Sequence, residues 1–326
     1  MTQNVRWGIL ATGAIAKKFA EGLRDARGAE LVAVGSRSQD KADAFGKQFN
    51  VPHCHGSYEA LAADADVDAI YVATPHPQHK PAASLCLEGG KAVLVEKPFT
   101  VNAREARELV ALARAKKRFC MEAMWTRFIP AIVRVRELVA SGAIGEVRMV
   151  AADFGFRGGL NPEGRLFNPR LAGGGLLDVG VYCVSFASMI LGTPVATTGA
   201  AHIGQTGVDE QAGMVLTYEG GKLAVLYTAV RTQTPVEASI LGTDGRIRIH
   251  NPFFKASKLT ITAGGKDETV EIPLRGNGYN YQAEHVGQCL RDGRTESDIM
   301  PLDETISIME TMDALRAQWK LRYPME

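Results

Sequence analysis

The chain has 326 residues, of which 46% are hydrophobic and 22% charged, with 37 Lys and Arg against 36 Asp and Glu. This length suits two globular domains, and the balanced charge gives no basic surplus for nucleic acid or an anionic membrane. The first residues lack the apolar run of a signal peptide, and no stretch approaches the length of a membrane-spanning helix. Five scattered cysteines are typical of reduced thiols in a cytoplasmic protein.

The first part of the chain alternates short apolar runs with helical patterns. Such continuous apolar runs are typical of parallel strands buried on both faces. We therefore predict an α/β domain with a doubly wound parallel sheet, a Rossmann fold, over residues 1–121. The expected strands are 5–10, 31–34, 69–73, 92–95 and 118–121, and the expected helices are 15–23, 41–49, 81–88 and 103–115.

The pattern changes after residue 121. A helix is expected at 132–139 and another, with one apolar stripe, at 306–319. Between them, apolar residues alternate with period two, and glycine pairs predict hairpin turns. We predict an α+β domain with a mostly antiparallel open sheet over residues 122–326. The alternating segments are 147–151, 223–227, 247–249 and 259–261, and the turns are 220–221, 244–245 and 264–265.

The turn after the first strand resembles the G-x-G-x-x-G/A dinucleotide fingerprint, with Ala11, Gly13 and Ala16 at its three key positions. Gly13 would let the backbone approach a pyrophosphate, and the helix N-terminus would offer N–H groups to it. Ala11 departs from the usual first glycine, so a glycine-rich turn without a ligand is the alternative. The residues expected to bind the phosphates are Ala11, Thr12, Gly13, Ala14 and Ile15.

The end of the second strand indicates which dinucleotide binds. An acidic residue there would bond the free ribose 2′-OH of NAD, but the sequence has Ser36 and Arg37, with Lys41 in the next helix. Hydroxyl and guanidinium groups suit a 2′-phosphate. We predict a preference for NADP(H). If Arg37 only stacks on the adenine, the protein would also use NAD(H).

No metal site is predicted. His53-Cys54-His55 has ligand-type side chains, but no second cluster of the usual spacing follows, so we interpret it as a loop with incidental ligands. His76 and His79 have no carboxylate or third ligand near them in the sequence.

Several further motifs occur in a fixed order along the chain. They are Ala73-Thr74-Pro75, Glu96-Lys97-Pro98, 121–128, 173–182 and 296–323. Together they resemble the Gfo/Idh/MocA (glucose–fructose oxidoreductase/inositol dehydrogenase) family, and most of all its branch of dimeric dihydrodiol dehydrogenases and NADP-dependent D-xylose 1-dehydrogenases. The resemblance implies a dehydrogenase for a sugar, polyol or dihydrodiol, a cis Lys97–Pro98 bond, and a homodimer formed through the second sheet.

Oxidising a carbinol requires a hydride acceptor and a base for the hydroxyl proton. A tyrosine can serve as that base if a nearby cation lowers its pKa. Lys97 ends a predicted parallel strand, and Asp178 and Tyr182 are spaced to share one helix face. The resemblance implies a catalytic set with Tyr182 as acid/base, Lys97 as its electrostatic partner and Asp178 as the orienting group. The alternatives are a packing tyrosine and a helix-capping aspartate.

Other candidates follow the predicted strands. Phe154 and Phe156 would wall the substrate pocket, with plain strand packing as the alternative. A catalytically silent NADP(H)-binding redox sensor or scaffold is the competing function, and the intact Lys97, Asp178 and Tyr182 argue against it. The remaining residues expected at the cofactor are Thr74, Pro75, His76, His79, Glu96, Lys97, Trp125 and Arg127.

Overall fold

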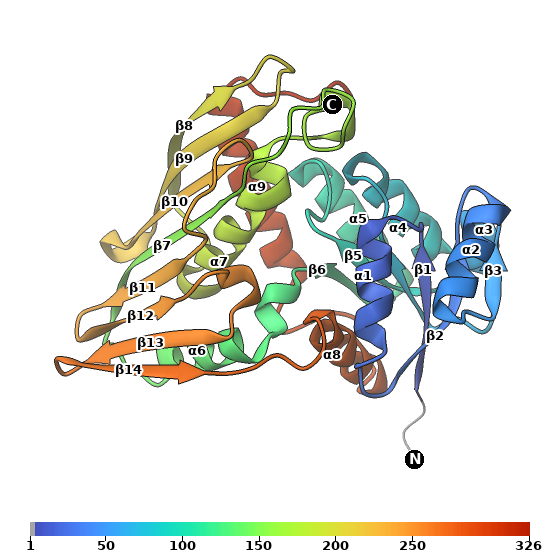
Figure 1. Ribbon diagram of the computed structural model, residues 1–326, viewed down its shortest axis with the longest axis horizontal. Helices are drawn as coiled ribbons and strands as arrows, with labels where there is room; N and C mark the ends of the chain where they lie inside the picture. The colour runs from blue at the N-terminus through green and yellow to red at the C-terminus, as the bar shows by residue number, and fades with distance from the viewer. Residues whose placement is uncertain (1–3) are drawn as a thin grey trace. The chain divides into compact units, whose positions relative to one another are not determined.

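The computed structural model describes residues 4–326 (Figure 1). The chain divides into two compact units, and the first contains residues up to 100, 104–125 and 275–305. The second contains residues 101–103, 126–274 and 306–326. The sequence predicts a domain boundary at residue 121. In the structure the second segment of the first unit ends at Trp125, and residues 275–305 also belong to that unit.

The first unit is built on a six-stranded parallel sheet with the strand order β3-β2-β1-β4-β5-β6. This is the order of a dinucleotide-binding Rossmann fold, in which ligands bind beyond the carboxyl ends of β1 and β4, where the order reverses. The predicted fold class is therefore confirmed for this unit. The strands are β1 (Val5–Leu10), β2 (Ala29–Gly35), β3 (His53–His55), β4 (Ala69–Val72), β5 (Ala92–Glu96) and β6 (Cys120–Ala123).

Helices cover this sheet as the alternating sequence predicts. Helix α1 packs with α8 against β2, while α3 packs with α4, which contacts β5. Helix α8 comes from the late segment and was not expected here. The helices are α1 (Ala14–Leu23), α2 (Gln39–Phe49), α3 (Tyr58–Ala63), α4 (His79–Glu88), α5 (Ala103–Lys116), whose first residue groups with the second unit, and α8 (Tyr279–Arg291).

Aromatic packing joins α1 to the two central strands. Phe19 stacks on Tyr71 with ring centroids 3.8 Å apart and meets Trp7 edge-on at 5.3 Å. All three side chains are fully buried. Burying such large rings is among the strongest stabilising contributions to a core, so β1, α1 and β4 form a rigid base for the turns that follow them.

The segment His53–His55 is an edge strand, β3, which corrects the interpretation of this triplet as a loop. It pairs in parallel with Ala33–Gly35 of β2. Three residues are too few to show a period-two pattern, so the pairing is decided by the neighbouring strand rather than by local sequence.

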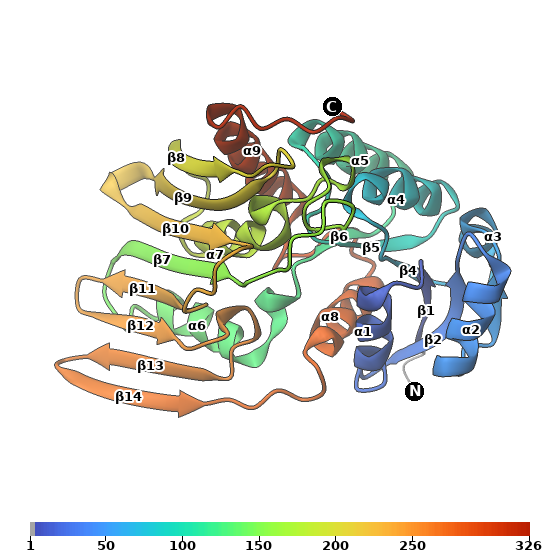
Figure 2. The same cartoon turned by 45° about the horizontal axis from the view of Figure 1, so that its top comes forward.

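The second unit is built on an eight-stranded sheet with the order β14-β13-β12-β11-β7-β10-β9-β8, which can be followed in Figure 2. Only the β7–β10 pair is parallel among these strands, so the prediction of a mostly antiparallel sheet is confirmed. The strands are β7 (Val147–Gly155), β8 (Ala196–Ile203), β9 (Asp209–Thr217), β10 (Leu223–Ala229), β11 (Ala238–Gly242), β12 (Gly245–Ile249), β13 (Lys258–Ala263) and β14 (Lys266–Glu271).

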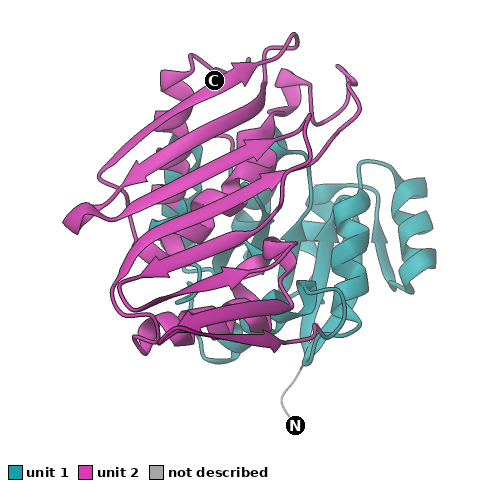
Figure 3. Ribbon diagram, turned by 60° about the vertical axis from the view of Figure 1, so that its left-hand side comes forward, with its two compact units in different colours: residues 1–100, 104–125, 275–305 teal, residues 101–103, 126–274, 306–326 magenta. Residues whose placement is uncertain are grey.

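One face of this sheet carries the helices and the other is open. Helix α7 packs on β7 and β10, and Figure 3 shows the strands in front with the helices of the same unit behind them. Burial alternates along β10, whose Val225 and Tyr227 are 40% and 42% exposed. Such alternation is typical of a sheet with one face against the core and one outward.

The helices of the second unit include one unusually apolar stretch. The sequence predicts no stretch of membrane-spanning length, but the helical stretch Pro169–Leu191 is long and apolar enough to cross a membrane. The most apolar 18 residues of this stretch are 83% buried within the protein, as in the core helix of a globular domain. The stretch runs through three consecutive helical segments, so its full length was not evident from the sequence. The longer helices of this unit are α6 (Pro130–Ala140), α7 (Val181–Leu191) and α9 (Leu302–Gln318), whose first four residues group with the first unit. Its short helices are η2 (Trp125–Phe128), whose first residue groups with the first unit, η3 (Pro169–Leu171), η4 (Leu176–Gly180, a π-helix), η5 (Glu219–Gly221) and η6 (Phe253–Lys255). The short helix η1 (His76–Gln78) belongs to the first unit.

Candidate active site

The turn after β1 leaves the N-terminus of α1 open. Gly13 is the N-cap residue and has no side chain to bond the first amides, and the first turn of the helix holds no acidic residue. A Cβ added to Gly13 would meet no atom within 4 Å. Uncapped amides beside open space fit an incoming pyrophosphate group, and Thr12, Ala14 and Ile15 flank them.

Ala11 occupies the position where the fingerprint has glycine, and it adopts a positive φ of 84°. Its N–H donates to the Gly35 carbonyl at 2.8 Å, which ties the turn to the end of β2. A positive φ is unfavourable for alanine. The turn therefore keeps the backbone conformation that glycine normally supplies.

The end of β2 places the residues expected at the adenosine ribose. Ser36 is buried, and its N–H donates to the His55 carbonyl at 3.0 Å. Arg37 and Lys41 are exposed. Burial raises the pKa of Tyr58, while the neighbouring Arg37 guanidinium opposes that shift. An exposed guanidinium beside a buried serine fits a 2′-phosphate.

The loop after β4 contains a buried hydroxyl with no hydrogen-bond partner in the described part of the chain, on Thr74. An orphaned buried donor is costly unless a ligand or water satisfies it, so this atom fits a bound cofactor. Pro75 precedes η1, and His76 is buried at its start.

His79 holds the loops after β4 and β5 together. Its Nδ1 lies 2.7 Å from the Pro98 carbonyl, and its Nε2 lies 2.9 Å from the Thr74 carbonyl. Burial lowers its pKa to about 4, although the contacts with the Pro98 and Thr74 carbonyls oppose that shift. The sequence predicts His79 at the cofactor. In the structure its ring contacts the backbone carbonyls of Thr74 and Pro98, and so helps to position these two loops.

The end of β5 presents Lys97 from a buried frame. The Tyr71 hydroxyl donates to the carboxylate of Glu96, which also accepts from the Lys97 N–H at 3.1 Å. The Lys97–Pro98 bond is cis, as the resemblance implies. The Phe99 N–H donates to Glu122 of β6 at 3.0 Å. These contacts fix the backbone on both sides of Lys97.

Trp125 and Arg127 follow β6. The Trp125 ring is buried and stacks on Tyr279 of α8, with centroids 4.6 Å apart. Arg127, in the second unit, donates from Nε to the Ser185 hydroxyl at 3.1 Å and from Nη2 to the Ser185 carbonyl at 2.9 Å. It thereby anchors α7, so within its own unit Arg127 serves to hold this helix.

A glycine run sets the start of the helix that carries the other candidates. A Cβ on Gly173 would approach the Leu166 carbonyl to 2.7 Å, and one on Gly174, at a φ of 111°, would overlap Asp209 Oδ1. Asp209 accepts from the Leu176 N–H at 2.6 Å. The glycines are therefore required by close approach, and Asp209, which the sequence did not single out, caps the helix.

Asp178 lies in the π-helical turn and is paired with an arginine that the sequence did not indicate. Arg165 donates from Nη1 to Asp178 Oδ1 at 2.6 Å. The Asp178 side chain is 7% exposed, and that of Arg165 is 52% exposed. Single π-turns within helices occur frequently at functional sites. Arg165 lies thirteen residues upstream in an irregular segment, where no periodic signal exists to find it.

Tyr182 stands in the first turn of α7 beside a stacked pair of aromatic rings. Its ring centroid lies 5.5 Å from that of Phe154 and 5.6 Å from that of Phe254. Phe154 and Phe254 stack on each other at 4.4 Å and are only half-buried. Phe156, which was expected at the substrate pocket together with Phe154, does not belong to this group of three rings. Phe254, in the short helix η6 after β12, was not predicted from the sequence.

The two units thus carry complementary chemistry. The first offers a turn with the features of a pyrophosphate site, a serine and arginine suited to the ribose, and Lys97. The second offers an acid/base-capable phenol, a paired carboxylate and apolar walls. Lys97 belongs to the first unit and Asp178 and Tyr182 to the second, so their joint action remains a prediction.

Known proteins match the chain over nearly its whole length. Residues 5–124 match the model of an oxidoreductase family with an NAD-binding Rossmann fold, and residues 132–248 match the GFO/IDH/MocA C-terminal domain. The protein is therefore an oxidoreductase with an NAD(P)-binding fold. It belongs to the Gfo/Idh/MocA family, as its motifs indicated.

Similar proteins include trans-1,2-dihydrobenzene-1,2-diol dehydrogenases. That of Mus musculus is 40% identical over 334 residues, and that of Homo sapiens is 38% identical over 338, each alignment covering 99% of both chains. Among solved structures, a 3-ketoreductase from Actinomadura kijaniata, in complex with NADP and TDP-benzene, is 25% identical with a TM-score of 0.85 and coverage of 97% of this chain and 98% of that one. An aldose–aldose oxidoreductase from Caulobacter crescentus has the same fold, with 24% identity, a TM-score of 0.89 and the same coverage. These relatives support a dehydrogenase acting on CH–OH donors.

Proposed function

We propose that this protein is an NADP-dependent dehydrogenase acting on a ring carbinol of a dihydrodiol, sugar or polyol. The observation that carries the proposal is Tyr182, which lies beside a stacked pair of half-buried phenylalanines and one helical turn after the Arg165-paired Asp178. The relatives named as dihydrodiol dehydrogenases match over 99% of the chain.

In this proposal Tyr182 is the acid/base. NADP⁺, when bound, supplies the acceptor for the hydride that leaves the carbinol carbon. The Tyr182 oxygen takes the proton from the substrate hydroxyl during oxidation and returns it during ketone reduction. The Lys97 ammonium favours the phenolate by its charge and donates a hydrogen bond to the substrate oxygen. Asp178 orients the polar groups around the phenol.

The walls of the site favour a flat, partly apolar substrate. Phe154 and Phe254 are stacked with an interplanar angle of 6°, so they form one aromatic stack beside Tyr182, and both rings are only half-buried. Aromatic faces bind aryl rings and the apolar faces of sugars through packing and dispersion. Within the proposed class, we place aryl dihydrodiols ahead of inositols.

The preference for NADP(H) over NAD(H) is supported by the end of β2. Ser36 is buried and Arg37 is exposed beside it, and neither residue is the carboxylate that would select a free ribose 2′-OH. The 3-ketoreductase from Actinomadura kijaniata, a relative solved in complex with NADP, agrees with this preference.

The test is turnover with a substrate panel. Purified protein is mixed with NADP⁺ or NAD⁺ and with aryl trans-dihydrodiols, aldoses or inositols, and absorbance of the reduced cofactor is followed. We expect turnover with NADP⁺, and the highest kcat/KM for an aryl dihydrodiol. Tight NADP(H) binding without turnover of any substrate would instead establish the sensor or scaffold function.

We also propose that two copies of the chain pair through the open face of the second sheet. The support is the exposure of Val225 and Tyr227 on β10, whose neighbours on that face have no helix over them in their own unit. A Val225→Glu variant should be a monomer by light scattering if the wild-type protein is a dimer. A wild-type monomer, or an unchanged dimer of the variant, would refute this pairing.

A cytoplasmic place of action completes the proposal. All five cysteines lie in the described residues, and each is a free thiol. Proteins of oxidising compartments more often pair such residues in disulfides. Fractionation of the native cell, with an antibody against the chain, tests this location.

A further inference from the structure

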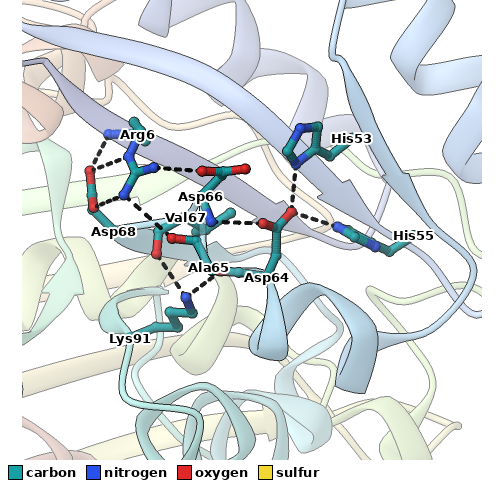
Figure 4. Close-up of polar contacts among 9 residues, drawn as sticks. All are labelled: Arg6, His53, His55, Asp64, Ala65, Asp66, Val67, Asp68 and Lys91. Atoms are coloured by element: carbon teal, nitrogen blue, oxygen red, sulfur yellow. Dashed lines mark hydrogen bonds and ion pairs between the residues drawn. The ribbon is translucent and has the colours of Figure 1, made fainter.

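Three metal-ligating side chains converge at the outer edge of the first unit. Asp64 Oδ2 lies 2.8 Å from His53 Nδ1 and 2.8 Å from His55 Nε2. The three ligand atoms all lie within 4.8 Å of one another. Figure 4 shows both imidazoles pointing at the same carboxylate oxygen.

The strand geometry explains the convergence. Successive side chains of a strand point to opposite faces, so His53 and His55 share one face of β3 and Cys54 faces the other way. Cys54 Sγ lies 3.6 Å from the Val51 carbonyl and close to Gly46 of α2. Asp64 is the C-cap residue of α3 and reaches back to the histidine face.

The carboxylate is held in place by a further contact. Asp64 Oδ1 accepts from the Asp66 N–H at 2.9 Å, which leaves Oδ2 directed at the imidazoles. Outer hydrogen bonds of this kind orient metal ligands in proteins. Burial opposes ionisation, but hydrogen bonds from the two histidines and from Asp66 lower the pKa of Asp64 to about 2, so the carboxylate is charged at neutral pH.

The nearby cations have other partners. Arg6 donates to Asp66 and to Asp68, each at 2.9 Å. Lys91 donates to the backbone carbonyls of Asp64 and Val67. Their charges point toward these acceptors, on the side of the loop away from the imidazoles in Figure 4.

We propose that His53, His55 and Asp64 bind a divalent transition-metal ion, with Zn²⁺ as the best match. Two imidazoles and one carboxylate are ligands that Zn²⁺ takes at about 2.0–2.2 Å. Tetrahedral bonds of that length separate ligand atoms by about 3.3 Å, so the two 2.8 Å contacts need open by only about half an ångström. The His53 and His55 side chains are 36% and 23% exposed, which lets an ion and a water as fourth ligand reach the site.

This site is separate from the residues proposed for catalysis, and a bound ion would have a structural role. A bound ion would join the edge strand β3 to the end of α3. Because the His55 carbonyl accepts from the Ser36 N–H at 3.0 Å, the ion would also brace the strand that supports the predicted ribose-binding residues.

The test uses full-length protein without a polyhistidine tag, stripped with a chelator and titrated with ZnCl₂ by calorimetry. We expect one Zn²⁺ per chain and a rise in Tm on binding. With Co²⁺ as a spectroscopic probe, we expect the intense visible absorption of tetrahedral coordination. Asp64→Asn and His55→Gln should each weaken Zn²⁺ binding by at least 10–100-fold, since even outer-shell changes cost that much.

Matched variants separate this site from other binding. Cys54 lies between the two histidine ligands in sequence but on the opposite face of β3, and His202 is an exposed histidine of the second sheet. The Cys54→Ser and His202→Gln variants should therefore bind Zn²⁺ like the wild type. His55→Gln retains a hydrogen-bond donor, so its circular dichroism should stay native. Three outcomes would show that the three residues form only a hydrogen-bonded cluster. The wild-type protein would not bind Zn²⁺, or both ligand variants would still bind it, or Cys54→Ser would abolish binding.

Discussion

Arg165 donates a hydrogen bond of 2.6 Å to Asp178, linking an exposed irregular segment to the buried π-turn one helical turn before Tyr182. Charge-assisted hydrogen bonds of this kind are worth about 1.5–3 kcal/mol. The pair therefore couples the position of Asp178 to a side chain that solvent can reach.

The first prediction concerns this pair. Arg165→Met should lower kcat/KM by about 10–100-fold, because the loss of about 1.5–3 kcal/mol leaves Asp178 less well oriented. Arg165→Lys should recover part of the activity, since it restores the charge without the planar fork. Steady-state kinetics measures both, with Arg157→Met, a change at an exposed arginine of the same loop, as control. Unchanged kinetics of Arg165→Met would remove Arg165 from the site.

The second prediction concerns Tyr182. Tyr182→Phe should lower kcat by about 10²–10⁴-fold, the usual contribution of a general acid/base, and should leave NADP(H) affinity unaltered. The matched control is Tyr218→Phe, which removes a buried hydroxyl of the same unit directly after β9. Cofactor binding is measured by fluorescence titration. A Tyr182→Phe enzyme with the wild-type rate would mean that another group moves the proton.

The third prediction concerns cofactor choice. Arg37→Ala should raise the KM for NADP⁺ by about 10–100-fold and leave the KM for NAD⁺ nearly unchanged, because only the former has a 2′-phosphate to pair with the guanidinium. Lys47→Ala removes an exposed positive charge from the last turn of α2 and should change neither value. Equal effects of Arg37→Ala on both cofactors would indicate stacking on the adenine.

The fourth prediction concerns pH and Asp209. Burial raises its pKa to about 7, although the Leu176 N–H opposes that shift. Between the ordinary value of 3.8 and about 7, the folded state holds a proton that the unfolded state has lost. Stability should therefore fall as pH rises through this window, by at most about 1.4 kcal/mol per pH unit.

Asp209→Asn removes this titration and retains an oxygen to accept from Leu176. The difference in unfolding free energy between variant and wild type should therefore shift in favour of the variant from pH 4 to pH 7. Urea denaturation at several pH values measures it. A difference that is constant with pH would show that Asp209 does not titrate in this range.

The fifth prediction concerns the glycine run. Gly174→Ala combines a φ of 111° with a Cβ that would overlap Asp209 Oδ1, so it should displace the helix cap and lower both stability and activity. At Gly192 the φ is 82° and the ψ −148°, but a Cβ would meet no atom within 4 Å, so Gly192→Ala should cost only about 1–3 kcal/mol of backbone strain. Equal Tm losses for the two variants would mean that the Asp209 contact is unimportant.

Local patterns were sufficient for the longer elements of the first unit, because those strands and helices are long enough to show a pattern, whereas the three-residue β3 and the six-residue α3 were missed. The turn from Ala11 to Ile15, the Ser36-Arg37 pair and the Glu96-Lys97-Pro98 segment all follow such strands, and their place in a parallel sheet follows from the order of elements. The period-two segments similarly predicted the second sheet, although not its parallel β7–β10 pair.

What the sequence by itself determined are the fold class, the family and the residue types that can perform hydride chemistry, because these depend on local periodicity and short motifs. Tertiary structure alone decided that Asp178 pairs with Arg165, that Phe254 walls Tyr182, and that Asp64 returns to His53 and His55. Each of these contacts joins residues from irregular loops or element ends, where spacing along the chain carries no information about distance. Packing of the complete core brings them together, so no local pattern could predict them.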